Sequence, residues 1–579
     1  DTTRRDMIGV TPARVRPALV GVLAFIWSLA ATAIMGSLGE PVATFQPPSN
    51  NAGQDATVAT NCRFGAAQVP DALESRPWLP TLAAGWYANF TPYGGSLPGV
   101  EYVFTARLRQ VRDGDIRYPE YTVLPPLVDT YEEDGVIHPG MKRYLEANPG
   151  AIWLIGNEIE IDNYRQDNIM PDLYAQAYHE IYHYIKSIDP TAKVAIGSVT
   201  MATPGRLQYL DIIWDTYQAR YGVPMPVDVW NFHLYILAER TMSPTPQYAD
   251  GKIALGTDPN LAYFSTNDSA LCPSPDLPDI AANDPRLDVY CKAEHDSLRI
   301  FSEQVYNMRR WMKAHGQQNK PLLLSEFGTL YRYEGGQPDG TCAERPDEFG
   351  QCMHPVRVSN YLRRTVNFME NTRDPELGYP RDDFRLIQRW LWYSIYTPGL
   401  IGDSSKLLID TYEAYPPGSP DALSMVGQAF REEALAHATR NLVAGSAKPA
   451  VAFVESADDV GDVLLTATFH NDGTYSIIDP FVVSFYSDAA LTSPIGSVVI
   501  DPTETGPVTG CSWIEDDLTA RIVWANLPVG SYRYWAKIDS AGQIGETTEG
   551  DNVTTSGVVG VYDSGQFAYR SYLPLAPGE

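Results

Sequence analysis

Short apolar segments alternate with amphipathic segments of helical period between residues 80 and 440. Strands buried on both faces are apolar throughout, and the helices between them cover the sheet, so this alternation favours a parallel α/β fold. The expected strands are Gly85–Phe90, Tyr102–Leu108, Ile152–Asn157, Lys193–Ser198, Val227–Tyr235, Pro321–Phe327 and Arg389–Ile395. The expected helices are Pro171–Ile188, Arg206–Tyr221, Ser297–His315 and Val356–Asn371.

Two of these strands end in a glutamate. One continues into Gly156-Asn157-Glu158, and the other ends in Ser325-Glu326. Hydrolysis of a glycosidic bond requires two carboxyl groups, one that protonates the leaving oxygen and one that attacks the anomeric carbon or activates water. The carboxyl ends of barrel strands meet at one mouth, where catalytic groups lie. We therefore predict that Glu158 and Glu326 form a catalytic pair in a (β/α)8 TIM barrel.

Such a barrel has one strand more than the seven expected from the pattern. The eighth strand is expected in the irregular stretch 109–138. An open doubly wound sheet is the alternative fold. The barrel is favoured because it opens both glutamate-bearing strands onto the same mouth.

Further polar and aromatic residues near the strand ends are candidates for substrate binding. Asn157 is placed to hydrogen-bond the sugar hydroxyl beside the anomeric carbon, and Arg107 to hold a hydroxyl or the nucleophile's charge. His233 and Tyr235 alternate onto one face, where the tyrosine can orient Glu326. For His233 the alternative is a core histidine bonded to the backbone.

Aromatic side chains on the first and last strands extend this set. An indole at the barrel mouth can stack on the apolar face of a sugar ring, and Trp392 on the last strand is the candidate. Trp390 shares its face and is expected to pack deeper. Trp86 and Asn89 on the first strand are further candidates.

A competing motif, His179-Glu180-Ile181-Tyr182-His183, satisfies the HExxH pattern of zinc peptidases. It lies on a helix that a barrel would place in its outer ring, and the third histidine of metzincins is absent. Tyr174, Tyr178, Tyr182 and Ile185 form an ordinary amphipathic stripe on the same helix. A zinc peptidase is therefore a weak alternative, and neither a metal nor another cofactor is expected.

The charge balance restricts the partners. Asp and Glu number 71 against 43 for Lys and Arg, a formal net charge of -28. So acidic a chain is unsuited to binding nucleic acid or anionic membranes. A surface with 12 Trp and 35 Tyr in the chain suits a neutral polysaccharide or oligosaccharide.

The first residues indicate export. Arginines at positions 4, 5, 14 and 16 precede an uncharged apolar run, Pro17–Met35, and Ala31-Thr32-Ala33 has the form of a signal-peptidase site. A cleaved signal peptide is favoured over an uncleaved membrane anchor. The expected localisation is extracellular or at the cell surface.

The cysteines agree with an oxidising compartment. Cys272 and Cys291 bracket one long insertion, and Cys342 and Cys352 bracket another. Whether Cys62 and Cys511 pair is left open by the sequence, and the absence of any CxxC spacing disfavours a metal site.

Beyond residue 440 the composition shifts to Ala, Ser, Gly and Lys and then to period-two strands. The pattern predicts a small antiparallel β-sandwich. Its expected strands are Val463–Asn471, Phe481–Ser487, Thr519–Trp524, Ser531–Ile538 and Thr554–Val561. The expected units are residues 1–36 (signal peptide or anchor), 37–79 (linker), 80–440 (barrel), 455–562 (sandwich) and 563–579 (tail).

The order Gly-Asn-Glu, His-x-Tyr, Ser-Glu-Phe-Gly and Trp-x-Trp-Tyr resembles the clan A glycoside hydrolases, and most closely the Asl1-like catalytic-core family of glycosidases and β-glucanases. The resemblance covers roughly residues 80–435. It implies a (β/α)8 barrel, Glu158 as acid/base, Glu326 as nucleophile and net retention of configuration. The family commonly continues Asn-Glu-Pro-Asp, where this chain has Ile159-Glu160 after the acid, so Glu160 is expected to perturb Glu158 if it enters the cleft.

The last unit resembles a CARDB-type immunoglobulin-like module. The similarity rests on 538–546, on Glu549-Gly550-Asp551-Asn552 and on His470-Asn471-Asp472-Gly473. Such modules serve adhesion or spacing on bacterial surface proteins, so the resemblance implies cell-surface association and no catalysis there. The whole chain is thus expected to be an exported glycosidase that cleaves a β-linked polysaccharide of the β-glucan class. A non-catalytic carbohydrate-binding barrel is the alternative.

Overall fold

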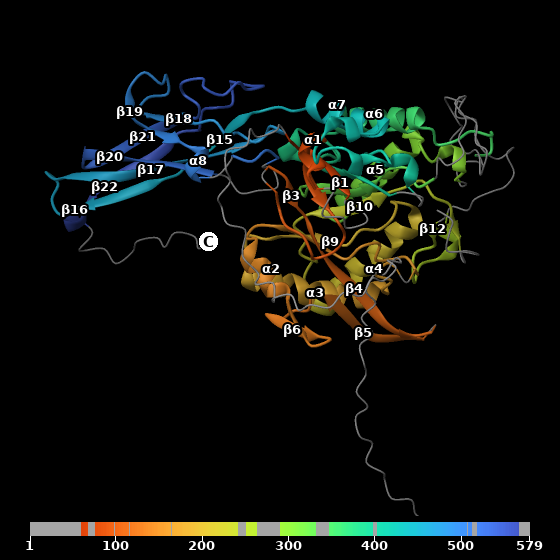
Figure 1. The fold of residues 1–579 in the computed structure, drawn as a ribbon. Coiled ribbons are helices and arrows are strands. Elements are labelled where there is room, and N and C mark those ends of the chain that lie inside the picture. Colours follow the sequence, from red (N-terminus) through yellow and green to blue (C-terminus); the bar gives the residue numbers. More distant parts are fainter. Residues whose placement is uncertain are drawn as a thin grey trace, which may run out of the picture. The chain divides into compact units, whose positions relative to one another are not determined.

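The computed structural model describes residues 60–67, 76–97, 99–114, 116–163, 165–240, 251–262, 290–331, 347–397, 402–505, 508–511 and 518–566 (Figure 1). The expected N-terminal apolar run and the 563–579 tail, apart from its first residues, lie outside this part of the chain. Among the described residues, no helix has both the length and the apolar character needed to cross a membrane.

A six-stranded sheet in the order β10-β13-β14-β1-β2-β3 carries much of the candidate site. All of its pairings are parallel. The strands are β1 (Asn61–Ala67), β2 (Ala84–Ala88), β3 (Glu101–Tyr102), β10 (Trp230–Leu234), β13 (Leu322–Phe327) and β14 (Arg389–Trp392). Every described residue of β2, β10, β13 and β14 is buried, as expected for parallel strands covered on both faces.

A second sheet has the order β5-β4-β8-β9. Its strands are β4 (Phe104–Asp113), β5 (Ile116–Leu124), β8 (Ile152–Ile155) and β9 (Lys193–Ile196). The β4–β8 and β8–β9 pairings are parallel, whereas β5 runs antiparallel to β4. Only Val103 separates β3 from β4, and a parallel bridge joins Ala195 of β9 to Val229, just before β10.

Helices cover these strands on two sides. Figure 1 shows α5, α6 and α7 on one side of β1, β9 and β10 and α2, α3 and α4 on the other. The helices are α1 (Trp78–Thr81), α2 (Met141–Ala147), α3 (Pro171–Ile188), α4 (Pro204–Tyr221), α5 (Leu298–Ala314), α6 (Pro355–Asn371) and α7 (Met425–Ala436). Proline in the first turn begins α3, α4 and α6, where its missing N–H costs no hydrogen bond.

Successive strand residues pack into two different clusters. Trp153 and Ile155 of β8 belong to the large cluster shared with the helices, whereas Ile152 and Leu154 belong to a smaller cluster on the opposite face. The alternation follows from the period of two along a strand. The chain up to α7 is therefore a mixed α/β structure whose parallel strands are buried on both faces.

Each of the seven expected strands overlaps an observed one, but the position expected for the eighth strand is wrong. The stretch 109–138 forms the end of β4, the antiparallel β5 and a hairpin of β6 (Thr130–Glu133) and β7 (Val136–Pro139). The strand missing from the pattern is β1, which lies in the stretch 37–79 expected to be a linker and pairs with β14 and β2.

Buried polar residues hide β1 from a hydrophobic pattern. Arg63 is enclosed and paired with Asp382, and Asn61 donates its side-chain amide to the Ala434 carbonyl at 2.9 Å. Because these polar groups are satisfied inside the protein, the strand tolerates them. Nothing in the local sequence shows where their partners lie.

The C-terminal strands form two further sheets, β15-β17-β20 and β16-β22-β21-β18-β19, around a core of their own. The strands are β15 (Leu442–Ala447), β16 (Ala450–Val454), β17 (Val460–Asn471), β18 (Phe481–Tyr486), β19 (Pro494–Ile500), β20 (Leu518–Pro528), β21 (Gly530–Lys537) and β22 (Gly557–Asp563). The short elements β11 (Glu239–Arg240), β12 (Gly251–Lys252) and α8 (Pro502–Thr505) complete the structure. Of the C-terminal strands, β15 and β16 both precede residue 455, so the expected start of the sandwich is too late. The small residues of β15 resemble a linker in composition.

A disulfide joins Cys62 at the start of β1 to Cys511, across a sequence separation of 449. The backbone N–H of Cys62 also donates to the Thr474 carbonyl at 2.9 Å. Cys291 and Cys352 are disulfide-bonded as well. Cys272 and Cys342, with which the sequence analysis associates them, lie outside the described residues.

We expect the Cys62→Ser/Cys511→Ser double variant to have a free energy of unfolding about 2–4 kcal/mol below that of the wild type. Removing a crosslink between such distant residues returns conformational entropy to the unfolded chain. Thermal unfolding without reducing agent measures the change. Adding a reducing agent to the double variant then measures how much the disulfides of Cys291 and Cys352 contribute to stability. Superimposable curves for double variant and wild type would contradict a stabilising crosslink.

Candidate active site

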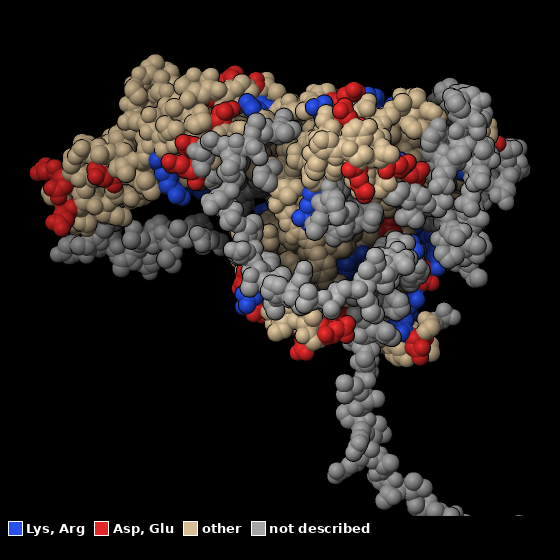
Figure 2. Space-filling view, viewed as in Figure 1, with Lys and Arg blue, Asp and Glu red and all other residues tan. Residues whose placement is uncertain are grey.

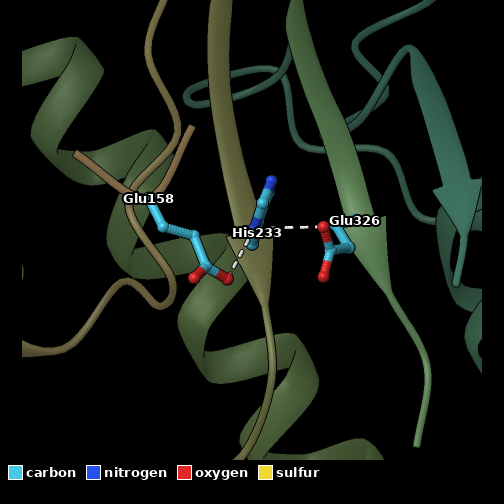
Figure 3. A group of neighbouring side chains, drawn as sticks. All are labelled: Glu158, His233 and Glu326. Carbon is cyan, nitrogen blue, oxygen red and sulfur yellow. Dashed lines mark hydrogen bonds and ion pairs between the residues drawn. The ribbon is translucent and has the colours of Figure 1, made fainter. Parts of the chain in front are cut away.

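Three buried side chains from separate strands meet at one point. Glu158 follows β8, His233 lies on β10 and Glu326 on β13 (Figure 3). The Nδ1 atom of His233 lies 3.3 Å from Oε1 of Glu158 and 3.7 Å from Oε2 of Glu326. One potential ligand atom from each residue lies within 4.8 Å of the other two. The two glutamates predicted from the sequence therefore face each other across an imidazole.

This trio is the one set of described acidic, histidine or cysteine side chains whose spacing would also suit a metal ion. Histidines that bind metals usually hold their second ring nitrogen in a hydrogen bond. The Nε2 atom of His233 is buried and has no such partner among the described residues. The donor set therefore fits acid–base chemistry better than a resident metal.

An unusual backbone directs Glu158 into the site. Gly156 has φ +107°, and a Cβ there would lie 2.5 Å from Cγ2 of Ile159. Glu158 itself has φ +47°, a conformation that costs about 1–3 kcal/mol in a non-glycine residue and persists only when its surroundings hold it. Its N–H donates to Oγ of Ser198 at 3.1 Å. The strand end is thus shaped to present this carboxyl group.

A β-bulge turns Glu326 toward the same point. Phe232 pairs with Leu324, but the next residue, His233, pairs with Glu326, so Ser325 is left over. Leu324 and Phe327 both pack in the large cluster. The extra residue reverses the alternation and brings the carboxylate to the face of His233.

The hydroxyl of Tyr235 donates to Oε1 of Glu326 at 2.6 Å, the contact anticipated from the strand period. The pKa of Glu326 is raised to about 7, and burial is the largest cause. The charge of His233, the Tyr235 hydrogen bond and the charge of Arg107 act to lower this pKa, whereas the charge of Glu158 raises it. Two buried carboxylates cannot both ionise cheaply, so Glu326 holds its proton to higher pH than an exposed glutamate.

The pKa of the His233 imidazole is raised as well, but for a different reason. Burial acts to lower the pKa of His233, but the charge of Glu326 and the hydrogen bond and charge of Glu158 outweigh it, and the pKa is raised. A positive charge here offsets the repulsion between the two carboxylates.

Asn157 and Arg107 lie beside the trio and are held by one buried carboxylate. Oδ2 of Asp167 accepts from the backbone N–H of Asn157 at 2.9 Å, and Oδ1 accepts from Nε of Arg107. The Asn157 side chain donates to Oε1 of Gln166 at 3.0 Å. Asp167 is thus a supporting residue that no motif in the sequence of its loop indicates.

Trp392 and Trp86 are both fully buried, so neither presents its indole at an open surface of the site. Trp392 is fully buried, donates to the Ser405 carbonyl at 2.7 Å and packs against Phe327 and Tyr361 of α6. Alternation along β14 turns this indole toward the helices.

Trp86 and Asn89 are both used internally. The Trp86 ring is fully buried and donates to the Arg63 carbonyl at 3.2 Å, under the guanidinium of Arg389. Asn89 accepts from the Thr91 hydroxyl at 2.8 Å and donates to the Tyr93 carbonyl at 2.8 Å, which secures the turn after β2.

Glu160, where the chain departs from the pattern of the family that it resembles, is held by residues outside the trio. It is fully buried and accepts from the N–H and hydroxyl of Thr200 at 2.8 and 2.7 Å and from Nε of Arg206 at 2.8 Å. Arg206 also pairs with Glu239. One buried guanidinium therefore ties together the segments that follow β8, β9 and β10.

The HExxH motif lies on α3 and is engaged by neighbouring aromatic residues. His179 shares a 2.8 Å hydrogen bond with the Tyr217 hydroxyl and stacks on Tyr221 at 3.6 Å. Oε2 of Glu180 accepts from Tyr121 at 2.5 Å. Within the described chain no third ligand joins the two histidines, so nothing supports a zinc peptidase.

Known proteins give limited similarity. No protein family and no curated protein sequence matches the chain. A glucosidase structure from Croceicoccus marinus shares 10% identity, covers 82% of this chain and 94% of its own, and has a TM-score of 0.31. A Bacteroides uniformis β-glucuronidase shares 9% identity over 87% of this chain and 46% of its own, with a TM-score of 0.30. A CARDB domain from Pyrococcus furiosus, in complex with di-metal ions, shares 17% identity over 21% of this chain and 94% of its own, with a TM-score of 0.16.

We expect Arg206→Met to lower the free energy of unfolding by about 3–5 kcal/mol, because it leaves the buried carboxylates of Glu160 and Glu239 without their guanidinium. Arg206→Lys, which keeps the charge, should cost less. Urea unfolding measures both. Arg310→Met, at an exposed position on α5, is the matched control and should change stability by less than about 0.5 kcal/mol. Equal effects at positions 206 and 310 would contradict the role of the network.

Proposed function

We propose that the protein is a retaining glycoside hydrolase in which Glu158 is the acid/base and Glu326 the nucleophile. The observation that supports this most is the approach of the two buried carboxyl groups, with one oxygen of each within 4.8 Å. Retaining enzymes hold their carboxyl groups about 5–5.5 Å apart, whereas inverting enzymes leave about 6.5–9.5 Å for a water molecule. The short separation favours direct attack by a carboxylate.

In the first step, a carboxylate oxygen of Glu326 attacks the anomeric carbon while the bond to the leaving oxygen breaks. Glu158 gives its proton to that oxygen. In the second step, water attacks the same carbon, Glu158 takes the water's proton and the bond to Glu326 breaks. Two inversions return the original anomeric configuration. The Tyr235 hydroxyl steadies the Glu326 oxygen that it contacts, and His233 offsets the paired negative charge.

The proposal includes a closed eight-stranded barrel. The strands would be β1, β2, β4, β8, β9, β10, β13 and β14, joined through the short connection at Val103 and the Ala195–Val229 bridge. It also includes a CARDB-type module formed by the C-terminal strands, with export to the cell surface or beyond. The sequence resemblance and the disulfides support these parts.

A neutral β-linked polysaccharide, such as a β-glucan, is the proposed substrate. The chain has 71 acidic against 43 basic residues, and Figure 2 shows Asp and Glu side chains interspersed with Lys and Arg on the face in view. Such a net negative charge repels polyanions. The family resemblance supports the β-glucan class.

We expect Glu158→Gln and Glu326→Gln each to lower kcat on soluble β-glucans by at least about 1000-fold, because each removes one of the two groups that make and break bonds. Reducing-sugar release measures activity, and NMR of the first product should show the substrate's anomeric configuration. Glu303→Gln, on the exposed face of α5, is the matched control. Binding without cleavage by the wild type would indicate the non-catalytic alternative, and inverted product would contradict Glu326 as nucleophile.

The pH profile tests the ionisation of the nucleophile. Because Glu326 must be ionised to attack, kcat/KM should rise with pH through its pKa of about 7. Tyr235→Phe removes a hydrogen bond that lowers this pKa, so the acidic limb should move up by about one pH unit. Tyr361→Phe, a buried tyrosine on α6, should leave the limb in place. If the acidic limb of the Tyr235→Phe profile stays in place or moves to lower pH, Glu326 is not the group whose ionisation sets that limb.

A further inference from the structure

Tyr393, directly after β14, turns its side chain to the opposite face from Trp392. Trp390 and Trp392 pack in the large cluster with the helices, whereas Leu391 and Tyr393 belong to or pack against the smaller cluster on the other face. Leu323 of β13 and Leu154 of β8 lie in that smaller cluster. The strand period therefore brings the tyrosine, and not the tryptophan, to the side on which Glu158 and Glu326 lie.

The side chain of Tyr393 is close enough to both glutamates to sense their charge. Burial, then the charges of Glu326 and Glu158, raise the pKa of Tyr393, while the charge of Arg165 acts to lower it. The hydroxyl is therefore neutral at any ordinary pH and available as a donor. It has no hydrogen-bond partner among the described residues, and the side chain is half-buried.

The surrounding backbone fixes this tyrosine in place. Its N–H donates to the Phe327 carbonyl at 2.8 Å, which links it to the residue after Glu326. Its carbonyl accepts from Oγ of Ser405 at 2.5 Å. Gly402, at φ +91°, passes so close that a Cβ would lie 2.9 Å from Cε1 of the ring. A hydroxyl group that is held in place and has no hydrogen-bond partner within the described protein is suited to bond to a ligand.

We propose that Tyr393 is a substrate-binding residue whose hydroxyl donates a hydrogen bond to a hydroxyl group of the sugar unit held between Glu158 and Glu326. The inference rests on the proposed function. A bound sugar would cover this half-buried hydroxyl, and a covered donor that meets no acceptor loses its hydrogen bond to water without replacement. The site therefore discriminates against a sugar that lacks, or carries a substituent on, the hydroxyl facing Tyr393.

The test removes this hydroxyl alone. Tyr393→Phe is compared with Tyr396→Phe, a half-buried tyrosine three residues further on whose ring packs against Tyr412 and whose pKa is not affected by either glutamate. Hydrolysis and calorimetric binding are measured with soluble β-1,3-glucan, mixed-linkage β-glucan and β-1,4-mannan oligosaccharides. Circular dichroism and thermal unfolding show whether each variant is folded.

We expect Tyr393→Phe to lower kcat/KM about five- to tenfold, the equivalent of one hydrogen bond, and Tyr396→Phe to stay within about twofold of the wild type. The comparison is repeated on aryl glycosides of the cleaved sugar that each lack one hydroxyl group. Loss of one particular hydroxyl should lower kcat/KM of the wild type by the same factor and should not lower kcat/KM of Tyr393→Phe any further. Such coupling would not arise from a purely structural role. Activity of Tyr393→Phe within twofold of the wild type, or an equal loss on every analogue, would overturn the assignment.

The two measurements separate this inference from the proposed function. If the wild type binds an oligosaccharide without cleaving it, and only Tyr393→Phe weakens the binding, the hydrolase is overturned and the role of Tyr393 stands. If the wild type cleaves an oligosaccharide and Tyr393→Phe changes neither cleavage nor binding, only the role of Tyr393 is overturned. If the wild type neither binds nor cleaves any oligosaccharide in the panel, both the hydrolase and the role of Tyr393 are overturned.

Discussion

Two carboxyl groups enclosed on either side of one imidazole impose the main electrostatic constraint on this structure. Burial alone would drive Glu326 to keep its proton, and the neighbouring Glu158 adds to that tendency. His233, Tyr235 and Arg107 oppose it with charge or a hydrogen bond. The balance leaves the pKa of Glu326 raised to about 7.

Holding these groups together costs backbone regularity. Glu158 adopts a left-handed conformation after Gly156, and Glu326 needs a bulge to face inward. Neither distortion would persist without support from neighbouring segments. That support includes Ser198, which accepts from the Glu158 N–H, and the buried network of Arg206 with Glu160, two residues after Glu158. Glu160, where the sequence departs from the pattern of the family that it resembles, is thus part of the frame that holds the site.

Buried polar pairs also explain why β1 is absent from the hydrophobic pattern. Arg63 and Asn61 would ordinarily mark an exposed loop, yet both are enclosed and satisfied by groups more than 300 residues away. Cys62 between them is crosslinked to Cys511. Long-range partners make this strand possible, and a local reading of residues 37–79 as a linker has no access to them.

The sequence by itself determined the order of seven strands and four helices, the glutamate pair and the partnership of Tyr235 with Glu326, because periods of 2 and 3.6 and strand-end positions are local properties. Tertiary structure alone decided which face each strand end presents. A bulge brought Glu326 inward, alternation sent Trp392 toward α6 and Tyr393 toward the carboxylates, and Arg206 drew Glu160 away from them. A shift of one residue reverses a side chain, and only packing and pairing with distant segments select the register.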